Sequence, residues 1–134
     1  MTAFRLKIVT PDGLKFTGMA QKIIVRTTTG DVAIMAKHTN YVAPLGMGEA
    51  AIYTEEGVRY GACIGGMVSV MDGEVNLVPM TFEWAEEIDV ARAEASKQRA
   101  EQLLAQQNAE DREILLAKAR LRRALVRQSA ASRQ

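Results

Sequence analysis

The chain has 134 residues, of which 48% are hydrophobic and 25% are charged, and its formal net charge is only +1. This length suits one compact domain, or one domain with a helical appendage, and the near-neutral balance indicates no particular partner. The single cysteine, Cys63, excludes an internal disulfide. No apolar stretch approaches the ~20 residues that cross a bilayer, so we expect a cytosolic or peripherally bound protein.

The N-terminal part of the chain alternates apolar with polar residues and is interrupted at short intervals by turn residues. Pro11-Asp12-Gly13 suits a chain reversal, because proline fixes φ and glycine accepts a positive φ. Asp72-Gly73 predicts a two-residue hairpin, and Gly65-Gly66 indicates a bulge or a close backbone approach. We expect about eight to ten short strands, a number typical of a sandwich or barrel.

The composition changes after Phe82, since residues 81–134 contain neither glycine nor proline and are rich in alanine, glutamine, arginine and glutamate. This change favours helices, with Asp89 capping a first helix and Asn108 capping a second. Because alanine side chains bury little apolar area, an antiparallel pair of such helices should be only marginally held together. The apolar stripes at helical spacing are Ala93, Ala100, Leu103 and Leu104, then Ile114, Ala117, Leu121, Ala124 and Leu125.

Charge is divided between the two parts of the chain. Residues 1–88 carry 7 basic and 10 acidic side chains, and residues 89–134 carry 10 and 6. The basic end of the last helix can be a solvated face that complements the helix dipole, or a site for anions, and the sequence leaves both open. Its cations are Lys118, Arg120, Arg122, Arg123, Arg127 and Arg133.

A set of short segments, several of them containing glycine or proline, carries a family resemblance when taken in order along the chain. They are residues 10–13, 30–34, 38, 44–45, 65–70, 75–78 and 86–89. Over nearly the whole chain, this set is similar to the epsilon subunits of bacterial F-type ATP synthases. Two departures stand close together, because Ala33 replaces a glycine that is usual in the family and Met35-Ala36-Lys37 replaces a usual leucine-proline-glycine.

The resemblance implies an α+β fold, with a flattened β-sandwich over residues 1–84 and an antiparallel two-helix hairpin over residues 85–134. It implies a non-catalytic rotor subunit that couples the catalytic head to the c-ring of a proton- or sodium-translocating ATP synthase. The expected partners are the gamma subunit, the c-ring and the alpha and beta subunits, toward which the hairpin extends to restrain ATP hydrolysis. The subunit would lie at the cytoplasmic face of the bacterial cell membrane, held there only through the complex, and would be a monomer when isolated.

Residues 88–93 match the Ile-Asp-x-x-Arg-Ala motif of epsilon subunits that bind ATP as a regulatory ligand. Arginines four or seven residues apart share one helix face, so a folded hairpin could bring such pairs together around phosphates. Arg122 remains an alternative to Arg123, and the sequence does not decide whether Mg²⁺ accompanies the nucleotide. By resemblance, the nucleotide-binding positions are Glu83, Ile88, Asp89, Arg92, Ala93, Arg99, Arg123 and Arg127.

Two other classes of function are weighed against this one. An enzyme could use His38 for acid-base work, but the sequence offers it no nucleophile motif, no metal-ligand spacing and no Walker loop, so we expect no catalytic and no metal-binding residue. A phosphate- or nucleic-acid-binding adaptor could use the arginine-rich last helix. Only 5% of residues are aromatic, which argues against base stacking, so we expect no nucleic-acid partner.

Overall fold

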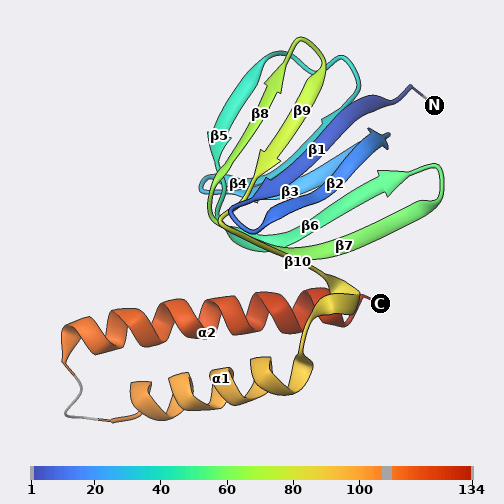
Figure 1. Cartoon of the computed structure of the whole chain (residues 1–134). Helices are drawn as coiled ribbons and strands as arrows, with labels where there is room; N and C mark the ends of the chain where they lie inside the picture. The colour runs from blue at the N-terminus through green and yellow to red at the C-terminus, as the bar shows by residue number, and fades with distance from the viewer. Residues whose placement is uncertain (1, 107–109, 134) are drawn as a thin grey trace.

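The computed structural model describes residues 2–106 and 110–133, and in this described part the N-terminal half forms ten strands in two sheets. Figure 1 shows how the strands are arranged above the helices. The strands are β1 (Phe4–Thr10), β2 (Gly13–Ala20), β3 (Lys22–Thr27), β4 (Gly30–Met35), β5 (Tyr41–Pro44), β6 (Met47–Thr54), β7 (Gly57–Ile64), β8 (Met67–Met71), β9 (Glu74–Val78) and β10 (Thr81–Trp84). One five-stranded sheet has the order β2-β1-β9-β8-β5 and the other β10-β7-β6-β3-β4. The predicted sandwich is confirmed.

Alternating burial along the strands places one apolar face of each sheet in a shared core. In β1, Leu6 and Ile8 are fully buried while Arg5 and Lys7 are exposed, because successive side chains of a strand point to opposite faces. Pairings between neighbouring strands in the sheets are antiparallel, except that β1 runs parallel to β9. The largest fully buried core side chains include Leu6, Ile8, Ile23, Ile34, Ile52 and Leu77.

Positive φ angles occur where the turns require them. Asp72 and Gly73 have φ of 51° and 83° between β8 and β9, which confirms the predicted hairpin. A Cβ on Gly66 would lie 2.0 Å from the carbonyl oxygen of Val78, which confirms a close backbone approach. Lys37 also has a positive φ, 64°, at the position where the related family usually has glycine.

The C-terminal part of the chain is a helical hairpin, preceded by the short 3-10 helix η1 (Ala85–Glu87). Helices α1 (Val90–Leu104) and α2 (Asp111–Ala131) run antiparallel (Figure 1). Asp89 caps α1 as predicted, with its Oδ1 accepting from the backbone N–H of Arg92 at 3.0 Å. Asn108, the predicted cap of α2, lies outside the described residues, and Glu110 occupies the N-cap position without a side-chain capping bond.

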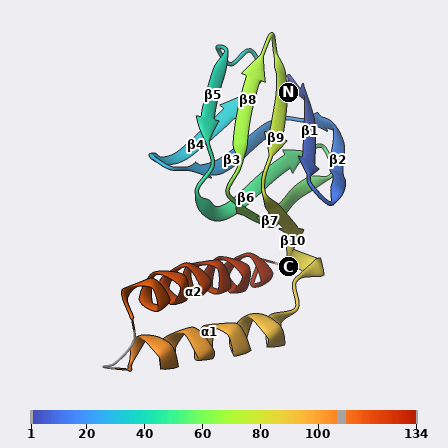
Figure 2. The ribbon, with the colours of Figure 1, turned by 60° about the vertical axis from the view of Figure 1, so that its left-hand side comes forward.

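The hairpin is folded against the sandwich, with α2 beside β6 and β7 and α1 on the far side of α2 (Figure 2). Ala62, Ile88 and Ala130 form a small buried cluster at this contact. Near the C-terminal end of α2, Ser129 donates to the Glu49 carboxylate, and Arg133 pairs with the same carboxylate at 3.3 Å. The seam between the helices is made mainly of alanines, and its buried members are Ala93, Ala100, Ala117 and Ala124.

Candidate functional site

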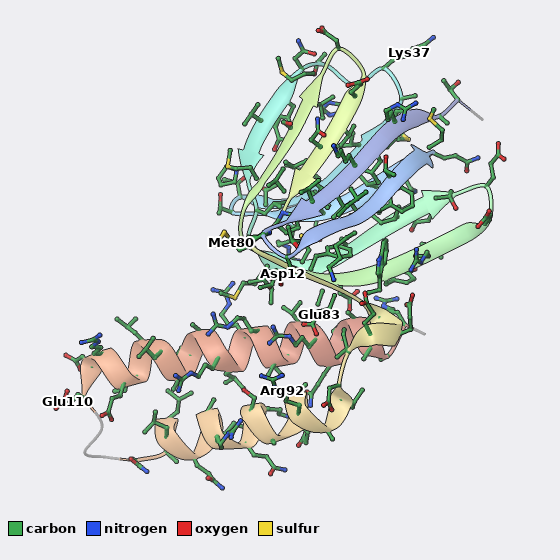
Figure 3. All side chains as sticks on the ribbon, in the orientation of Figure 1. Asp12, Lys37, Met80, Glu83, Arg92 and Glu110 are labelled. Atoms are coloured by element: carbon green, nitrogen blue, oxygen red, sulfur yellow. The ribbon has the colours of Figure 1, made fainter. Side chains whose placement is uncertain are left out.

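A pocket of about 510 Å³ lies where α1, α2, β10 and the β1–β2 turn meet. This volume falls in the range that small-molecule ligands occupy, about 300 to 1,000 Å³. Figure 3 places Arg92 on the side of α1 that faces α2, and Glu83 near the sandwich end of the hairpin. The charged and polar lining residues are Asp12, Lys15, Thr81, Glu83, Glu87, Asp89, Arg92, Ser96, Arg99 and Arg127.

An ion pair joins the two domains across this pocket. Arg127 Nε donates to Glu83 Oε1 at 2.5 Å, connecting α2 to β10. The two side chains are 30% and 35% exposed, so screening by water limits the pair to about 1 kcal/mol or less. Arg127 is therefore held in place but can exchange its partner for another anion at modest cost.

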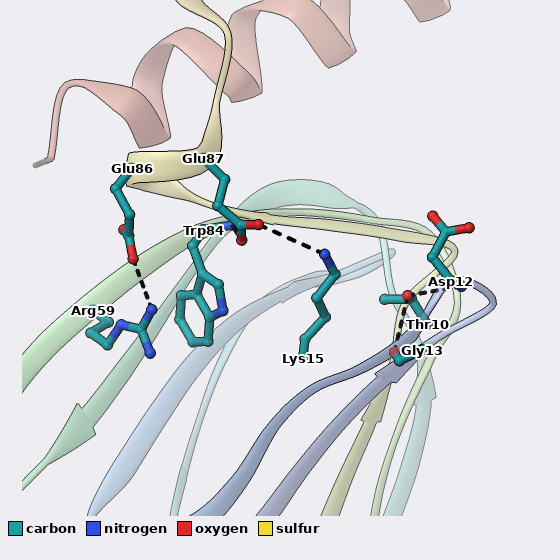
Figure 4. Close-up of polar contacts among 8 residues, drawn as sticks. All are labelled: Thr10, Asp12, Gly13, Lys15, Arg59, Trp84, Glu86 and Glu87. Atoms are coloured by element: carbon teal, nitrogen blue, oxygen red, sulfur yellow. Dashed lines mark hydrogen bonds and ion pairs between the residues drawn. The ribbon is translucent and has the colours of Figure 1, made fainter.

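The sandwich side of the pocket is braced by contacts around η1, shown in Figure 4. Lys15 Nζ lies 4.0 Å from Glu87 Oε2, and Glu87 Oε1 accepts from the backbone N–H of Trp84 at 3.1 Å. Arg59 donates to Glu86 at 2.8 Å and stacks over the Trp84 ring at 3.7 Å. The hydrogen bond from Arg59 lowers the pKa of the Glu86 carboxyl.

A second pocket of about 410 Å³ runs between the two helices and shares Ser96, Arg99 and Arg127 with the first. Its other lining residues are Ala100, Leu103, Ala117, Arg120 and Arg123. The second pocket is thus lined by four arginines and no carboxylate, whereas four carboxylates balance the four cations of the first. The pair of pockets offers an electropositive groove that opens into a polar, charge-balanced chamber.

The structure brings seven of the eight predicted site residues to these two pockets. Arg123 lines the groove between the helices, whereas Arg122 lines a different pocket beside Arg26 and Gly30 of the sandwich. Ile88 lines neither pocket and is instead buried at 6% exposure in the docking cluster. The six that line the first pocket are Glu83, Asp89, Arg92, Ala93, Arg99 and Arg127.

Sequence reasoning did not place Arg120, Ser96, Lys15 or Asp12 among the nucleotide-binding residues, although it named Arg120 among the cations of a possible anion site. Arg120 could have been assigned to the nucleotide site, because it lies three and seven residues before Arg123 and Arg127 and so shares their helix face. Ser96 also lies at helical spacing, four residues after Arg92. Lys15 and Asp12 come from the β1–β2 hairpin, and no local pattern signals that this turn approaches a helix more than 70 residues later.

The described residues contain no group of three or more histidine, cysteine or acidic side chains placed to hold a metal ion. Among the helices that the structure describes, none is long and apolar enough to cross a membrane. His38 Nδ1 lies 2.7 Å from the carbonyl oxygen of Thr39, and its ring packs edge-on against Tyr41. Cys63 is buried, and burial raises the pKa of its thiol to about 12.

Two family models divide this chain between them. The β-sandwich domain of the ATP synthase delta/epsilon chain matches residues 3–85, and the long alpha-helix domain of the same chain matches residues 86–132. The sandwich and the helical hairpin therefore match the two domains of the ATP synthase delta/epsilon class of proteins.

Individual relatives narrow this class. The ATP synthase epsilon chain of Ruminococcus albus is 38% identical over 135 residues, and the match covers 100% of both chains. That of Caldanaerobacter subterraneus is 37% identical over 131 residues, covering 97% of this chain and 94% of its own. The chain belongs to the family of bacterial F-type ATP synthase epsilon subunits.

Solved structures share the fold at lower identity. A chain of the Euglena gracilis mitochondrial ATP synthase, in an assembly of OSCP, F1 and c-ring, has a TM-score of 0.84 at 20% identity and covers 100% of this chain and 83% of that one. A chain of the Tetrahymena thermophila mitochondrial ATP synthase, in its central stalk and c-ring, has a TM-score of 0.68 at 16% identity, with 95% of each chain covered. At these identities the likeness supports the arrangement of sandwich and hairpin.

Proposed function

We propose that this subunit sits in the central stalk of a bacterial ATP synthase and uses its hairpin as a brake on ATP hydrolysis that bound ATP holds off. The observation that carries the proposal is the convergence of four arginines on the groove between the helices, which opens into the chamber lined by Arg92 and Asp89. Arginine guanidinium groups suit phosphates because they are always charged and donate two parallel hydrogen bonds. The subunit itself performs no chemical step.

The two pockets differ in charge in the way that the two ends of ATP differ. The groove between the helices, with four arginines and no carboxylate, suits the triphosphate. The balanced chamber suits the uncharged nucleoside, where Glu83 and Asp89 can accept from ribose hydroxyls or the adenine amine, and Ala93 offers a small apolar surface. A Mg²⁺ ion bound with the nucleotide would lie in the groove beside the phosphates.

The site can regulate because its walls come from different elements. Arg99 belongs to α1, Arg127 to α2 and Glu83 to β10, so an extended hairpin would take the pocket apart. A ligand that binds only the folded form stabilises it by about 2.7 kcal/mol at 100 times its dissociation constant. This is of the order of the contacts that dock α2, which are one small apolar cluster and a few exposed polar pairs. Abundant ATP would therefore retain the hairpin on the sandwich.

A different surface supports docking into the stalk. Met67 of β8 pairs in register with Pro44 of β5 and with Val78 of β9, and Met67 and Val78 are 43% and 47% exposed. Met80, just beyond β9, is 61% exposed. Such an exposed apolar patch is typical of a protein interface, and we assign it to the gamma subunit. The c-ring would lie beside the sandwich, the alpha and beta subunits within reach of an extended hairpin, and the whole would be peripheral to the cytoplasmic face of the membrane.

Nucleic-acid binding gains less support from the geometry. Arg120, Arg123 and Arg127 line a narrow pocket between two helices rather than a continuous outer face. A duplex backbone needs cations spread along an open surface. The same arrangement favours a small polyphosphate.

The proposal is tested by calorimetric titration of the full chain with ATP and ADP, with and without Mg²⁺. We expect one saturable site for ATP, weakened by about tenfold or more in Arg92→Ala, since the loss of one hydrogen bond to a charged group costs at least about 1.5 kcal/mol. Lys118→Ala is the matched control, because Lys118 carries the same charge on the same hairpin but lines neither pocket. No binding by the wild-type chain at millimolar ATP would refute the nucleotide-controlled brake.

A further inference from the structure

The groove between the helices holds more positive charge than the contacts of the hairpin can explain. Among the described residues, Arg99, Arg120 and Arg123 make no ion pair with any carboxylate, and only Arg127 of the four has a partner, Glu83. Like charges facing one pocket repel one another and destabilise the folded hairpin. An anion in the groove would remove that repulsion.

Of the four arginines that line the groove, Arg120 is the one whose position the dipole of α2 explains least. Cations near a helix C-terminus are favoured by the dipole, but that effect falls off within the last turn, and Arg120 lies eleven residues before the end of α2 at Ala131. The residues one turn away from it, at positions 116, 117, 123 and 124, include no acidic side chain that could pair with it along the helix. Arg120 is exposed to solvent and lines the groove, so an anion bound there would be its first ionic partner among the described residues.

The order of the arginines along α2 fixes an order along the groove. Arg127 lines both pockets, whereas Arg123 and Arg120 line only the groove, so the path from the balanced chamber passes Arg127, then Arg123, then Arg120. At 1.5 Å per residue, Arg120 lies about 4.5 Å beyond Arg123 and about 10 Å beyond Arg127 along the helix axis. The part of a nucleotide farthest from its nucleoside is the terminal phosphate.

We propose that Arg120 binds the terminal phosphate of ATP and so determines the preference of the site for ATP over ADP. This inference rests on the proposed function, because it takes the nucleoside to lie in the chamber beside Asp89 and Arg92. Arg99 and Arg127 then hold the phosphates that ATP and ADP share, and Arg120 distinguishes a high from a low ATP level. Arg120 is a specificity-determining residue outside the positions that the family resemblance supplied.

The experiment titrates the full-length wild type, Arg120→Gln and the control Lys118→Gln with ATP and ADP in calorimetry at fixed ionic strength. Arg120→Gln keeps a long polar side chain on the groove face, and Lys118→Gln removes the same charge from a position that lines neither pocket. We expect Arg120→Gln to weaken ATP about tenfold or more and ADP less than about threefold, as the loss of one charge-assisted hydrogen bond to one phosphate predicts. Circular dichroism melting checks that each variant folds.

Equal weakening of ATP and ADP in Arg120→Gln would overturn the proposal, because the arginine would then act through the general field of the groove. Unchanged binding of both, or an equal loss of ATP affinity in Lys118→Gln, would overturn it as well. Absence of binding by the wild type is a distinct result, since it refutes the proposed function and the assignment of Arg120 with it. A tripolyphosphate titration adds a readout of the groove alone, where Arg120→Gln should weaken tripolyphosphate more than pyrophosphate.

Discussion

Replacing Ala130 by aspartate should release the hairpin from the sandwich while leaving the sandwich folded. Ala130 is fully buried against Ala62 and Ile88, where an unpaired carboxylate would cost several kcal/mol. The opposing contacts are small, because the polar pairs that dock α2 are partly exposed and worth about 1 kcal/mol or less each. The apolar cluster adds about 0.8 kcal/mol per buried methylene, so one buried charge outweighs much of the docking free energy.

A disulfide reporter measures this docking directly. Glu49 and Ser129 are in hydrogen-bond contact, so cysteines at these two positions should cross-link when the hairpin is folded. The native Cys63 should not interfere, because it is buried and the pKa of its thiol is raised to about 12. In this double-cysteine background we expect Ala130→Asp to slow the initial rate of disulfide formation about tenfold or more, since each 1.4 kcal/mol changes the docked-to-undocked ratio tenfold.

Ser132→Asp is the matched control, since it adds the same charge two residues later at an exposed position. It should leave the cross-linking rate close to that of the parent. An unchanged rate in Ala130→Asp would refute the reasoning, because it would mean that the cluster around Ala130 does not hold α2 in place. Loss of the sandwich unfolding transition would refute it too, since the charge would then have disrupted the core instead of the docking contact.

Two further predictions concern the sandwich and its junction. Lys37→Gly should raise the free energy of unfolding by up to about 1 kcal/mol in urea titrations, because a non-glycine residue at a φ of 64° is strained, and a decrease would contradict this. Glu86→Gln should lower the stability at pH 7 but match the wild type once the pH lies well below the folded-state pKa of Glu86. The Arg59 contact depresses the folded-state pKa of Glu86 below 4.5, so its contribution is present above that value and is lost as the pH falls through the folded pKa. A difference between the two proteins that persists after the Glu86 carboxyl is fully protonated would show that the contact acts through packing rather than charge.

The elements of the fold could be predicted because local patterns decide them. Alternation in β1, the Asp72-Gly73 turn and the cap at Asp89 each follow from interactions within a few residues. The sheet order could not be predicted in the same way, since the pairing of β1 with β9 depends on which apolar faces meet across the whole core. Helical periodicity likewise predicts which residues of the two helices face each other, but not which face of α2 packs against the sandwich.

The candidate site could be predicted to the same extent: local spacing along the chain was informative, and long-range contacts were not. Spacing along each helix put Arg92 with Arg99 and Arg123 with Arg127. The structure places Arg99, Arg123 and Arg127 around the groove between the helices, whereas Arg92 lines only the adjoining chamber. Ile88 was carried over from a motif, and a motif does not distinguish a residue that lines a pocket from one that packs behind it. Lys15 escaped notice because strand periodicity assigns it only to a face of the sandwich, while its place at the pocket depends on how the hairpin docks.

The parallel pairing of β1 with β9 also constrains how the chain folds as it is synthesised. Lys7 is paired with Asn76, so β1, which leaves the ribosome first, can complete its pairing only after β9 has been synthesised. Contacts that are so distant in sequence form slowly, whereas the hairpin needs only neighbouring residues and can form quickly. Between the two events β1 presents an edge that another strand can occupy. The nascent sandwich is therefore the stage at which mispairing between copies of this chain is most probable, and rapid completion of β9 protects it.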